Sequence, residues 1–337
     1  MTGVICGTGA YVPSFIMDNN DIAKLVDTSD AWIRERTGVA RRHIAKGDTT
    51  VSMACEAARR ALEQASVSPK DLDLILVSTV SSNVILPCTA CHVQEELEAV
   101  NSTCFDINGA CTGFVLAYNT AVAYLASGVF ETALIIGSET LSNLVDWTDR
   151  GTCILFGDGA GAAVLKKSEG RRYLPVTHSD GASGAALTCQ SRTKDVQSRI
   201  AGCFPESQNI DLIAVASNHE RDCFVQMNGQ AVFKFAVKKV AEAIQEVLER
   251  NKLPQEEVDL FILHQANERI IEGIAKRLQE PIEKFPMNLA EYGNTSSASI
   301  PILLDELNRQ GILKAGRKYI LAGFGAGLTW GATIVEW

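Results

Sequence analysis

Positive charge is in short supply in this chain. Its 337 residues include 31 Lys and Arg against 40 Asp and Glu, which leaves a formal net charge of −9 at pH 7. A protein with this balance is not attracted to nucleic acid or to anionic membranes. We therefore expect neither to be a main partner, although the net charge is compatible with a local basic patch.

Two kinds of targeting or cofactor signal are also missing. The N-terminal segment MTGVICGTGAYVPS lacks the basic flank and the long apolar run of a secretory signal. We expect a cytoplasmic protein whose ten cysteines are reduced thiols. Cys88 to His92 spell CTACH, the pattern of covalent haem attachment, but that attachment requires export. Since no second cysteine pair supplies zinc ligands either, we predict neither haem nor a metal site.

One segment has no charge over a length that would cross a bilayer. Residues Ile107–Phe130 contain no Asp, Glu, Lys or Arg, but they do contain Asn108, Asn119 and three glycines. This composition suits a helix that is buried on all sides inside a large protein. We predict a core helix and no membrane span.

The chain repeats itself weakly. Asp73–Leu76 lies at the end of a helix-to-strand unit. Asp259–Ile262 lies at the end of a second such unit, 186 residues further along the chain (259 − 73 = 186). The same offset pairs the strand-like runs Ala133–Gly137 and Tyr319–Gly323, glycine with glycine. Because short apolar runs alternate with helical patterns, we predict a duplicated α/β unit with largely parallel sheets.

The repeat divides the chain into two halves, residues 1–172 and 173–337. The first half carries a candidate nucleophile, and the second carries a histidine and an asparagine of interest. The segment His178–Cys223 is the least regular part of the sequence, and we interpret it as an insertion or a long loop.

Cys111 stands in DINGACTGF, after the strand-like run Ser102–Asp106 and at the start of the uncharged helix. A thiol at a helix N-terminus feels the positive end of the helix dipole, which stabilises the thiolate. The flanking glycines permit a tight turn and the close approach of a ligand. Most cytosolic cysteines are small core residues, and we interpret the other nine in this way. The context of Cys111 favours a nucleophile.

His264 directly follows the strand Leu260–Leu263, and α/β proteins bind ligands at the carboxyl ends of such strands. Asn294 stands in EYGNTSSASIP, a glycine-containing turn before the next helix. Taken singly, each has an ordinary structural interpretation, as a strand cap and a turn residue. The 186-residue offset pairs Cys111 with Ser297, so two equivalent helix starts are expected to meet at one site.

Two glycine-rich segments remain. Gly323–Gly331, GFGAGLTWG, follows a strand and can present backbone N–H groups to an oxyanion. Gly157–Ala163, GDGAGAA, leads into a strand and not into the helix that a dinucleotide loop requires. We interpret both as packing turns or oxyanion elements.

The segments DINGACTGF, HQANERI, GNTSSASIP and FGAGLTWG resemble, in this order, the motifs of the β-ketoacyl-acyl-carrier-protein synthase III family. The resemblance runs from Gly3 to Trp337. It implies the thiolase fold, with mixed, mostly parallel sheets in α-β-α-β-α layers, and a homodimer. It also implies an acyltransferase that initiates fatty acid synthesis. The reaction is a decarboxylating Claisen condensation of an acyl-CoA primer with malonyl-acyl-carrier protein. No cofactor is implied, because acyl-CoA is a substrate.

The resemblance also implies roles for individual residues. Cys111 would take the acyl group as a thioester, and the backbone N–H groups of Cys111 and Ala326 would hold the oxyanion. His264 and Asn294 would donate hydrogen bonds to the malonyl thioester carbonyl and stabilise the enolate that forms as CO₂ leaves. Phe324 would screen the departing carboxylate.

Binding roles follow from the same resemblance. Trp32 and Arg150 would sandwich the CoA adenine, and Arg36 would lie near its phosphates. Lys234 and Arg269, with Lys238 as a further candidate, would dock the acidic carrier protein. Without the resemblance, each of these charged residues would be interpreted as an ordinary solvated side chain.

The sequence departs from the family pattern at a few positions. Leu86 stands where phenylalanine is common, Gln230 where asparagine is common, and Ala326 replaces the central glycine of its loop. In the family, the position of Leu86 lies at the dimer interface and closes the partner's acyl pocket. The segment His178–Cys223 is also longer than is usual in the family. Leu86 and this long segment affect the choice of primer and not the class of reaction.

Two other functions were weighed. A related condensing enzyme that primes a specialised polyketide pathway would share the same motifs. A papain-like cysteine peptidase or amidase also has Cys, His and Asn in this order. Cys111 lacks the C-G-[SA]-C-[WY] context of those enzymes, which disfavours the peptidase.

Overall fold

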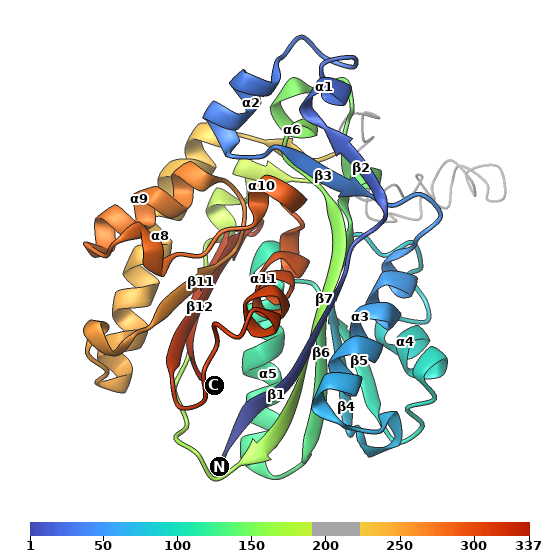
Figure 1. The fold of residues 1–337 in the computed structure, drawn as a ribbon, viewed down its shortest axis with the longest axis vertical. Coiled ribbons are helices and arrows are strands. Elements are labelled where there is room, and N and C mark those ends of the chain that lie inside the picture. The colour runs from blue at the N-terminus through green and yellow to red at the C-terminus, as the bar shows by residue number, and fades with distance from the viewer. Residues whose placement is uncertain (191–222) are drawn as a thin grey trace, which may run out of the picture.

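The computed structural model describes residues 1–190 and 223–337 (Figure 1). Most of the irregular segment predicted between His178 and Cys223 lies outside the described residues. Its described ends include β8 (Val176–Ser179), a 3-10 turn at Gly181–Ala186, and β9 (Leu187–Thr188), which pairs with β10 (Gln226–Met227).

The described chain is built of two sheets with helices between them and on both outer sides (Figure 1). The first sheet has the strand order β1-β7-β6-β4-β5, with β1 (Thr2–Tyr11), β4 (Leu74–Ser78), β5 (Thr103–Ile107), β6 (Thr132–Thr140) and β7 (Asp158–Ser168). The second has the order β11-β12-β13-β8, with β11 (Leu260–Leu263), β12 (Lys318–Gly325) and β13 (Thr329–Glu336). The predicted α-β-α-β-α layering is confirmed.

Both sheets are mixed, as predicted, but parallel pairing is less extensive than expected. Parallel pairs join β4 to β5, β4 to β6, and β11 to β12. The pairs that involve β1, β7, β8 and β13 are antiparallel. The connection between β12 and β13 gives the reason in the second sheet: a tight turn follows Gly325, and a tight turn can join only antiparallel neighbours.

Helices supply the other three layers and a cap. The outer layers are α3 (Thr50–Ala65) with α4 (Thr89–Leu97), and α8 (Gly229–Asn251) with α9 (Glu268–Leu278), while α5 (Gly113–Ser127) and α11 (Ser299–Arg309) lie between the sheets. The cap consists of α1 (Asn19–Ile22), α2 (Asp30–Thr37), α6 (Arg150–Cys153), the ribbon of β2 (Phe15–Asp18) and β3 (Arg41–Ile44), and α10 (Leu289–Tyr292), which packs on β3.

The uncharged segment forms the central helix α5, as predicted. By composition and length, Ala110–Ser127 could cross a membrane, but 56% of it is buried inside the protein. Figure 1 shows α5 enclosed between the two sheets. This position explains why the helix carries no charge, since a charged side chain there would lose its hydration without gaining a partner.

The 186-residue offset holds in the structure. The pairs β4 and β11, β6 and β12, and α5 and α11 each begin 186 residues apart (260 − 74, 318 − 132, 299 − 113). The residues equivalent to β5 form α10 instead, so the second sheet has one strand fewer. The chain passes from the first sheet to the second between Ser168 and Val176. The division at residues 172 and 173 stays a prediction.

Matched glycines bring the two equivalent turns close to the opposite sheet. A Cβ atom on Gly137 of β6 would lie 2.3 Å from the carbonyl oxygen of Ser297. A Cβ atom on Gly323 of β12 would lie 3.2 Å from the carbonyl oxygen of Cys111. The turns themselves, Ala110–Thr112 and Ser296–Ala298, also contact each other. Each half therefore packs against the turn that begins the central helix of the other half, and the two turns meet at a pseudo-twofold axis.

Candidate active site

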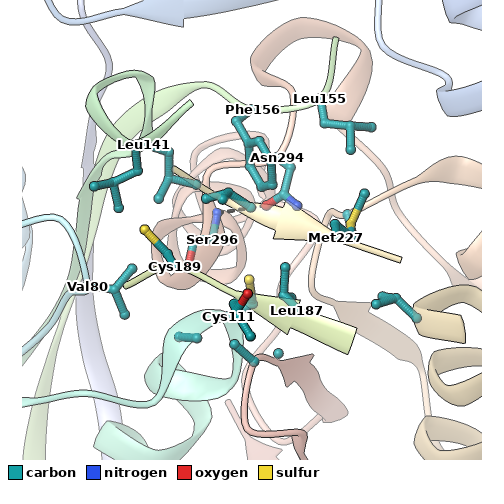
Figure 2. Close-up of a pocket in the computed structure, with 18 of the residues that line it drawn as sticks. Val80, Cys111, Leu141, Leu155, Phe156, Leu187, Cys189, Met227, Asn294 and Ser296 are labelled. Carbon is teal, nitrogen blue, oxygen red and sulfur yellow. Dashed lines mark hydrogen bonds between the residues drawn. The ribbon is translucent and has the colours of Figure 1, made fainter. Parts of the chain in front are cut away.

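Cys111, His264 and Asn294 line one cavity of about 1670 Å³. They reach it from three separate elements: the turn before α5, the end of β11, and the loop after α10. Apolar side chains form much of the wall, among them Val80, Leu141, Leu155, Leu187 and Met227 (Figure 2). No Asp, Glu, Lys or Arg is among the lining residues in the described parts of the chain.

Cys111 sits in a turn that only small neighbours allow. Ala110 before it adopts a left-handed φ of 44°. A Cβ atom on Gly325 would lie 2.7 Å from the Cys111 amide nitrogen, so the β12 end approaches the nucleophile closely because it has no side chain there.

The ionisation of Cys111 differs from the sequence prediction. We expected the helix N-terminus to stabilise the thiolate. Instead, burial raises the pKa of the Cys111 thiol to about 12, and a hydrogen bond with Ser296 only partly opposes this. Cys111 lies in the 3-10 turn Ala110–Thr112 that leads directly into α5, and its burial there disfavours the charged thiolate. Burial therefore favours the neutral thiol over the thiolate.

His264 is a neutral imidazole fixed by its neighbours. Its backbone N–H donates to the Ala322 carbonyl at 2.9 Å, which continues the pairing of β11 with β12. Its Nδ1 lies 2.7 Å from the Ser299 hydroxyl, and that hydroxyl also accepts the Gln265 N–H at 3.3 Å. Burial lowers the pKa of His264 to about 3. Since Ser299 Oγ accepts from Gln265, its own proton is available to Nδ1, which leaves Nε2–H as a donor.

Asn294 is fixed through both its backbone and its amide. Its N–H donates to the Leu155 carbonyl at 2.8 Å, and its carbonyl accepts the Gly157 N–H at 3.0 Å. The side-chain oxygen accepts the Ser296 N–H at 2.9 Å (Figure 2). Because the oxygen is occupied by this bond, the NH₂ end of the amide is the part left for a ligand.

The glycine-rich segment Gly323–Gly331, which joins the end of β12 to the start of β13, faces the same cavity. Phe324 and Ala326 both line it, and the Phe324 ring meets the His264 ring edge-on at 5.3 Å between centroids. Reciprocal backbone hydrogen bonds of 2.7 and 2.8 Å tie Leu328 to Asp180 and hold the turn in place. The segment GDGAGAA lies within β7 and its preceding turn, which agrees with a packing element and not a cofactor loop.

The predicted CoA residues gather at the cap. The guanidinium groups of Arg150 and Arg36 lie 5.1 and 5.8 Å from the centre of the Trp32 ring. Thr37 of α2 and Gly151 of α6 line the cavity, so these helices form part of its rim. The structure brings Trp32, Arg36 and Arg150 together beside the cavity.

Lys234 and Arg269 are exposed on the neighbouring helices α8 and α9. Within the described residues neither forms a salt bridge, whereas Lys238 on α8 lies 4.0 Å from Glu242. Phe233, next to Lys234, lines the cavity. Among the described residues, no salt bridge neutralises Lys234 or Arg269, and each stands next to a residue that lines the cavity, Phe233 and Ile270 respectively.

Leu86 lies apart from the cavity of its own chain. Its side chain is 84% exposed, as is that of its neighbour Ile85 at 85%. Ile85 lines the cavity and Leu86 does not. The effect expected of Leu86 therefore depends on a second copy of the chain.

Cys88 and Cys91, from the haem-like pattern, flank the start of α4, where their sulfur atoms lie 3.4 Å apart. Groups of three or more residues able to hold a metal ion do not occur in the described parts of the chain.

Three residues that matter to the geometry escaped the sequence analysis. Ser299 holds His264, Ser296 holds Asn294, and Glu139 is a buried acid behind Cys111. The serines stand in the Asn294 motif, where three serines in four residues are a visible signal. Glu139 had a weaker signal, an acidic residue directly after an apolar strand.

The comparisons with known proteins cover the whole chain. Models of the family described as 3-oxoacyl-[acyl-carrier-protein] synthase III match residues 105–184 and, for its C-terminal part, residues 248–337. A β-ketoacyl-[acyl-carrier-protein] synthase III of Clostridium acetobutylicum is 43% identical over 334 residues, which covers 99% of this chain and 98% of the relative.

Solved structures give the same result. The 3-oxoacyl-[acyl-carrier-protein] synthase III of Aquifex aeolicus VF5 is 40% identical, with a TM-score of 0.88, and the match covers 99% of this chain and 100% of that one. The priming β-ketosynthase of the R1128 polyketide pathway has the same TM-score of 0.88 at 32% identity, over 99% of this chain and 96% of that one. The full-length match at 43% identity shows that this chain belongs to the β-ketoacyl-acyl-carrier-protein synthase III family of thiolase-fold condensing acyltransferases.

Proposed function

We propose that this protein condenses an acyl-CoA primer with malonyl-acyl-carrier protein and so initiates fatty acid synthesis. The convergence of Cys111, His264 and Asn294 on one cavity without a lining Asp, Glu, Lys or Arg in the described chain is the observation that carries the proposal. A nucleophile and two neutral hydrogen-bond donors suit acyl transfer followed by enolate stabilisation. Priming of a specialised polyketide pathway is not favoured, because the R1128 polyketide ketosynthase is 32% identical to this chain, whereas the synthase III enzymes of Clostridium acetobutylicum and Aquifex aeolicus are 43% and 40% identical.

In the first half-reaction, the Cys111 sulfur attacks the thioester carbon of acyl-CoA. Negative charge develops on the carbonyl oxygen, and the backbone N–H groups of Cys111 and Ala326 stabilise it. The collapse of this intermediate releases CoA and leaves an acyl-cysteine. The close approach of Gly325 to the Cys111 amide supports this pairing of N–H groups.

In the second half-reaction, His264 Nε2–H and Asn294 NH₂ donate to the thioester carbonyl of malonyl-acyl-carrier protein. These bonds strengthen as CO₂ leaves, because the oxygen becomes an enolate. Phe324 forms an apolar wall against the departing carboxylate, and the enolate carbon attacks the acyl-cysteine. A neutral imidazole is required as a donor here, and the lowered pKa of His264 supports this state.

The remaining partners are proposals of the same kind. Trp32 and Arg150 would bind the CoA adenine and Arg36 its phosphates, and no cofactor takes part. We propose a cytoplasmic homodimer that binds neither nucleic acid nor membrane. Two observations support a dimer: β5 is a partly exposed edge strand of the first sheet, and the apolar side chains of Leu86 and Val100 are exposed.

A panel of acyl-CoAs tests the function. Incubation of the protein with each acyl-CoA should add the mass of one acyl group to Cys111, and malonyl-acyl-carrier protein should then remove it as the β-ketoacyl product. We expect acetyl-CoA to react, and four- or five-carbon primers to react at least as well. A protein that gains no acyl mass from any member of the panel would contradict the proposed function.

Leu86→Phe should shift the preference toward acetyl-CoA. A phenylalanine ring at the far end of the partner's acyl pocket removes volume, and one methylene in an apolar slot is worth ~1–3 kcal/mol of discrimination. The measurement is kcat/KM for each primer in the variant and the wild type. An unchanged primer profile would locate the determinant elsewhere, for example in the segment His178–Cys223.

Carrier docking should be electrostatic. Lys234→Glu or Arg269→Glu should raise KM for malonyl-acyl-carrier protein by about tenfold while acylation from acyl-CoA stays nearly intact. Added salt should have the same effect, because exposed charges are screened over ~10 Å at 0.1 M. Lys238→Glu is the matched control on α8, because Lys238 already lies near Glu242 and should have a smaller effect. Salt-independent kinetics with the carrier would exclude this surface.

A further inference from the structure

Arg42 is a cation buried inside the protein. It lies in β3, is fully buried, and does not line the cavity. Its Nη1 donates to the side-chain oxygen of Asn19 at 2.9 Å and to the Met17 carbonyl at 3.4 Å, and its Nη2 donates to the Ile154 carbonyl at 2.7 Å. The acceptors of these bonds are all neutral oxygens. Its Nε has no hydrogen-bond partner in the described parts of the chain.

A guanidinium group in this position is costly to the fold. Burying a charge costs free energy unless it is paired as well as hydrogen-bonded, and the bonds of Arg42 go only to neutral oxygens. Burial lowers the pKa of Arg42 to about 10, so the group still carries its charge at neutral pH. An apolar side chain of similar length would fill much of the same space without this cost. The reason for the guanidinium therefore lies in the segments that it holds.

One of these segments, residues 154–157, supports the backbone of Asn294. The segment joins α6 to β7, and Arg42 Nη2 binds the carbonyl of its first residue. The next carbonyl, that of Leu155, accepts the Asn294 N–H at 2.8 Å, and the Gly157 N–H donates to the Asn294 carbonyl at 3.0 Å. Figure 2 shows Leu155 beside Asn294 at the cavity wall. The guanidinium therefore holds the short segment against which Asn294 is placed.

The aliphatic stem of Arg42 packs at the same place. A Cβ atom on Gly157 would lie 3.1 Å from the Arg42 Cβ, and a Cβ atom on Gly293 would lie 3.4 Å from it. These two glycines follow Phe156 and precede Asn294, the two residues that form an isolated parallel bridge. Because neither glycine has a side chain, β3 can approach the bridge closely. Arg42 thus contacts the support of Asn294 with its stem and bonds to it with its guanidinium.

Asn294 depends on this support more than the other donor does. Its bond to the Ser296 N–H orients the amide within its own turn, whereas the bonds to residues 154–157 fix where that turn lies in the cavity wall. His264 is held separately, by the pairing of β11 with β12 and by the Ser299 hydroxyl at 2.7 Å. A change at Arg42 should therefore reach one of the two donors and not the other.

We propose that Arg42 is a positioning residue for the half-reaction with malonyl-acyl-carrier protein. It fixes residues 154–157 and, through them, the place at which the Asn294 NH₂ meets the enolate oxygen. The proposal rests on the proposed function, because the enolate belongs to that reaction. A misplacement of about 1 Å can cost ~10²-fold in rate, so a donor to a developing charge needs such support. Arg42 has no task in acylation, because the turn of Cys111 packs against β12 instead.

Arg42→Met tests the proposal, because methionine keeps an apolar stem and removes the donors. We expect single-turnover condensation of the preformed acyl-enzyme to slow by about tenfold, while acylation from acyl-CoA stays within about threefold of wild type. The start of α6 has its own support for acylation, because Arg150 donates to the Asp27 carbonyl at 3.0 Å. Arg42→Lys keeps a charged donor for the Ile154 carbonyl and should lose less. It is the variant to measure if Arg42→Met does not fold.

Two backgrounds separate positioning from a general loss of structure. Once Asn294→Ala has removed the amide, Arg42→Met should slow condensation no further, because no donor is left to position. In the His264→Ala background, the loss of about tenfold should remain. Arg41→Met is the matched control on β3, since the exposed pair of Arg41 with Glu291 at 2.6 Å contributes little. Equal losses in both half-reactions, or a loss that persists without the Asn294 amide, would overturn the proposal.

Amide hydrogen exchange tests the same support without any substrate. Arg42→Met should speed exchange of the Asn294 and Gly157 N–H groups by about tenfold. The His264 N–H should exchange as in the wild type, because it is bonded to the Ala322 carbonyl. Unchanged exchange at Asn294 and Gly157 would overturn the proposal. Failure of the wild type to react with any acyl-CoA would reject the proposed function, while exchange would still decide whether Arg42 holds Asn294.

Discussion

Cys111→Ala should form no acyl-enzyme with any acyl-CoA. The described cavity wall offers no second nucleophile in the turn that Gly325 and Gly323 approach, and alanine keeps the volume of that turn almost unchanged. Decarboxylation of malonyl-acyl-carrier protein should persist, because His264 and Asn294 are held by Ser299 and Ser296 and not by Cys111. The measurement is the intact mass of the protein after incubation with acyl-CoA, together with CO₂ release from malonyl-acyl-carrier protein.

Cys153→Ala is the matched control, since Cys153 is also buried but does not line the cavity. It should acquire acyl mass like the wild type. Acyl mass on Cys111→Ala, at any residue, would mean that the nucleophile has been misassigned. Loss of decarboxylation together with acylation would mean that Cys111 also supports the site that holds the malonyl group.

His264→Ala and Asn294→Ala should each slow condensation by ~10²-fold or more while Cys111 still becomes acylated. This is the scale of losing one donor to a developing oxyanion. Each donor has its own support, so the removal of one leaves the other in place. Single-turnover reaction of the preformed acyl-enzyme with malonyl-acyl-carrier protein measures the step directly, and acyl-CoA loading measures the other half-reaction.

The two half-reactions should respond differently, and that difference is the test. Equal losses in acylation and condensation would show that His264 and Asn294 serve Cys111 and not the enolate. Ser299→Ala provides a graded comparison, because it removes the hydroxyl beside His264 Nδ1 but leaves the ring. We expect it to slow condensation by less than His264→Ala does.

The sequence was sufficient to predict the duplicated layers and the meeting of the two halves. The offset rested on short apolar runs and on the pair Gly137 and Gly323, and both reflect the packing of the core, where little variation is tolerated. The pairing of the strands within each sheet was harder to predict. Mostly parallel pairing was expected because strands and helices alternate, but pattern alone does not show that β12 turns directly into β13.

The pKa of Cys111 could not be predicted from the sequence. A cysteine beside a helix start predicts a stabilised thiolate, but the pKa of Cys111 depends on how completely the cavity wall excludes water. Glu139 was missed for a similar reason. Its hydrogen-bond partners come from two distant segments, Thr79 to Ser81 and Ser297, which only the fold brings together around it.

The matched glycines have a consequence for the assembly of the molecule. The strand that makes room for Cys111 belongs to the second half, and the strand that makes room for Ser297 belongs to the first. Exchange of this kind is what two identical subunits make across a dyad, so the internal axis has the geometry of an interface in a symmetric dimer. The nucleophile's surroundings therefore exist only when both halves are folded and docked, and no fragment that contains a single sheet holds a complete centre.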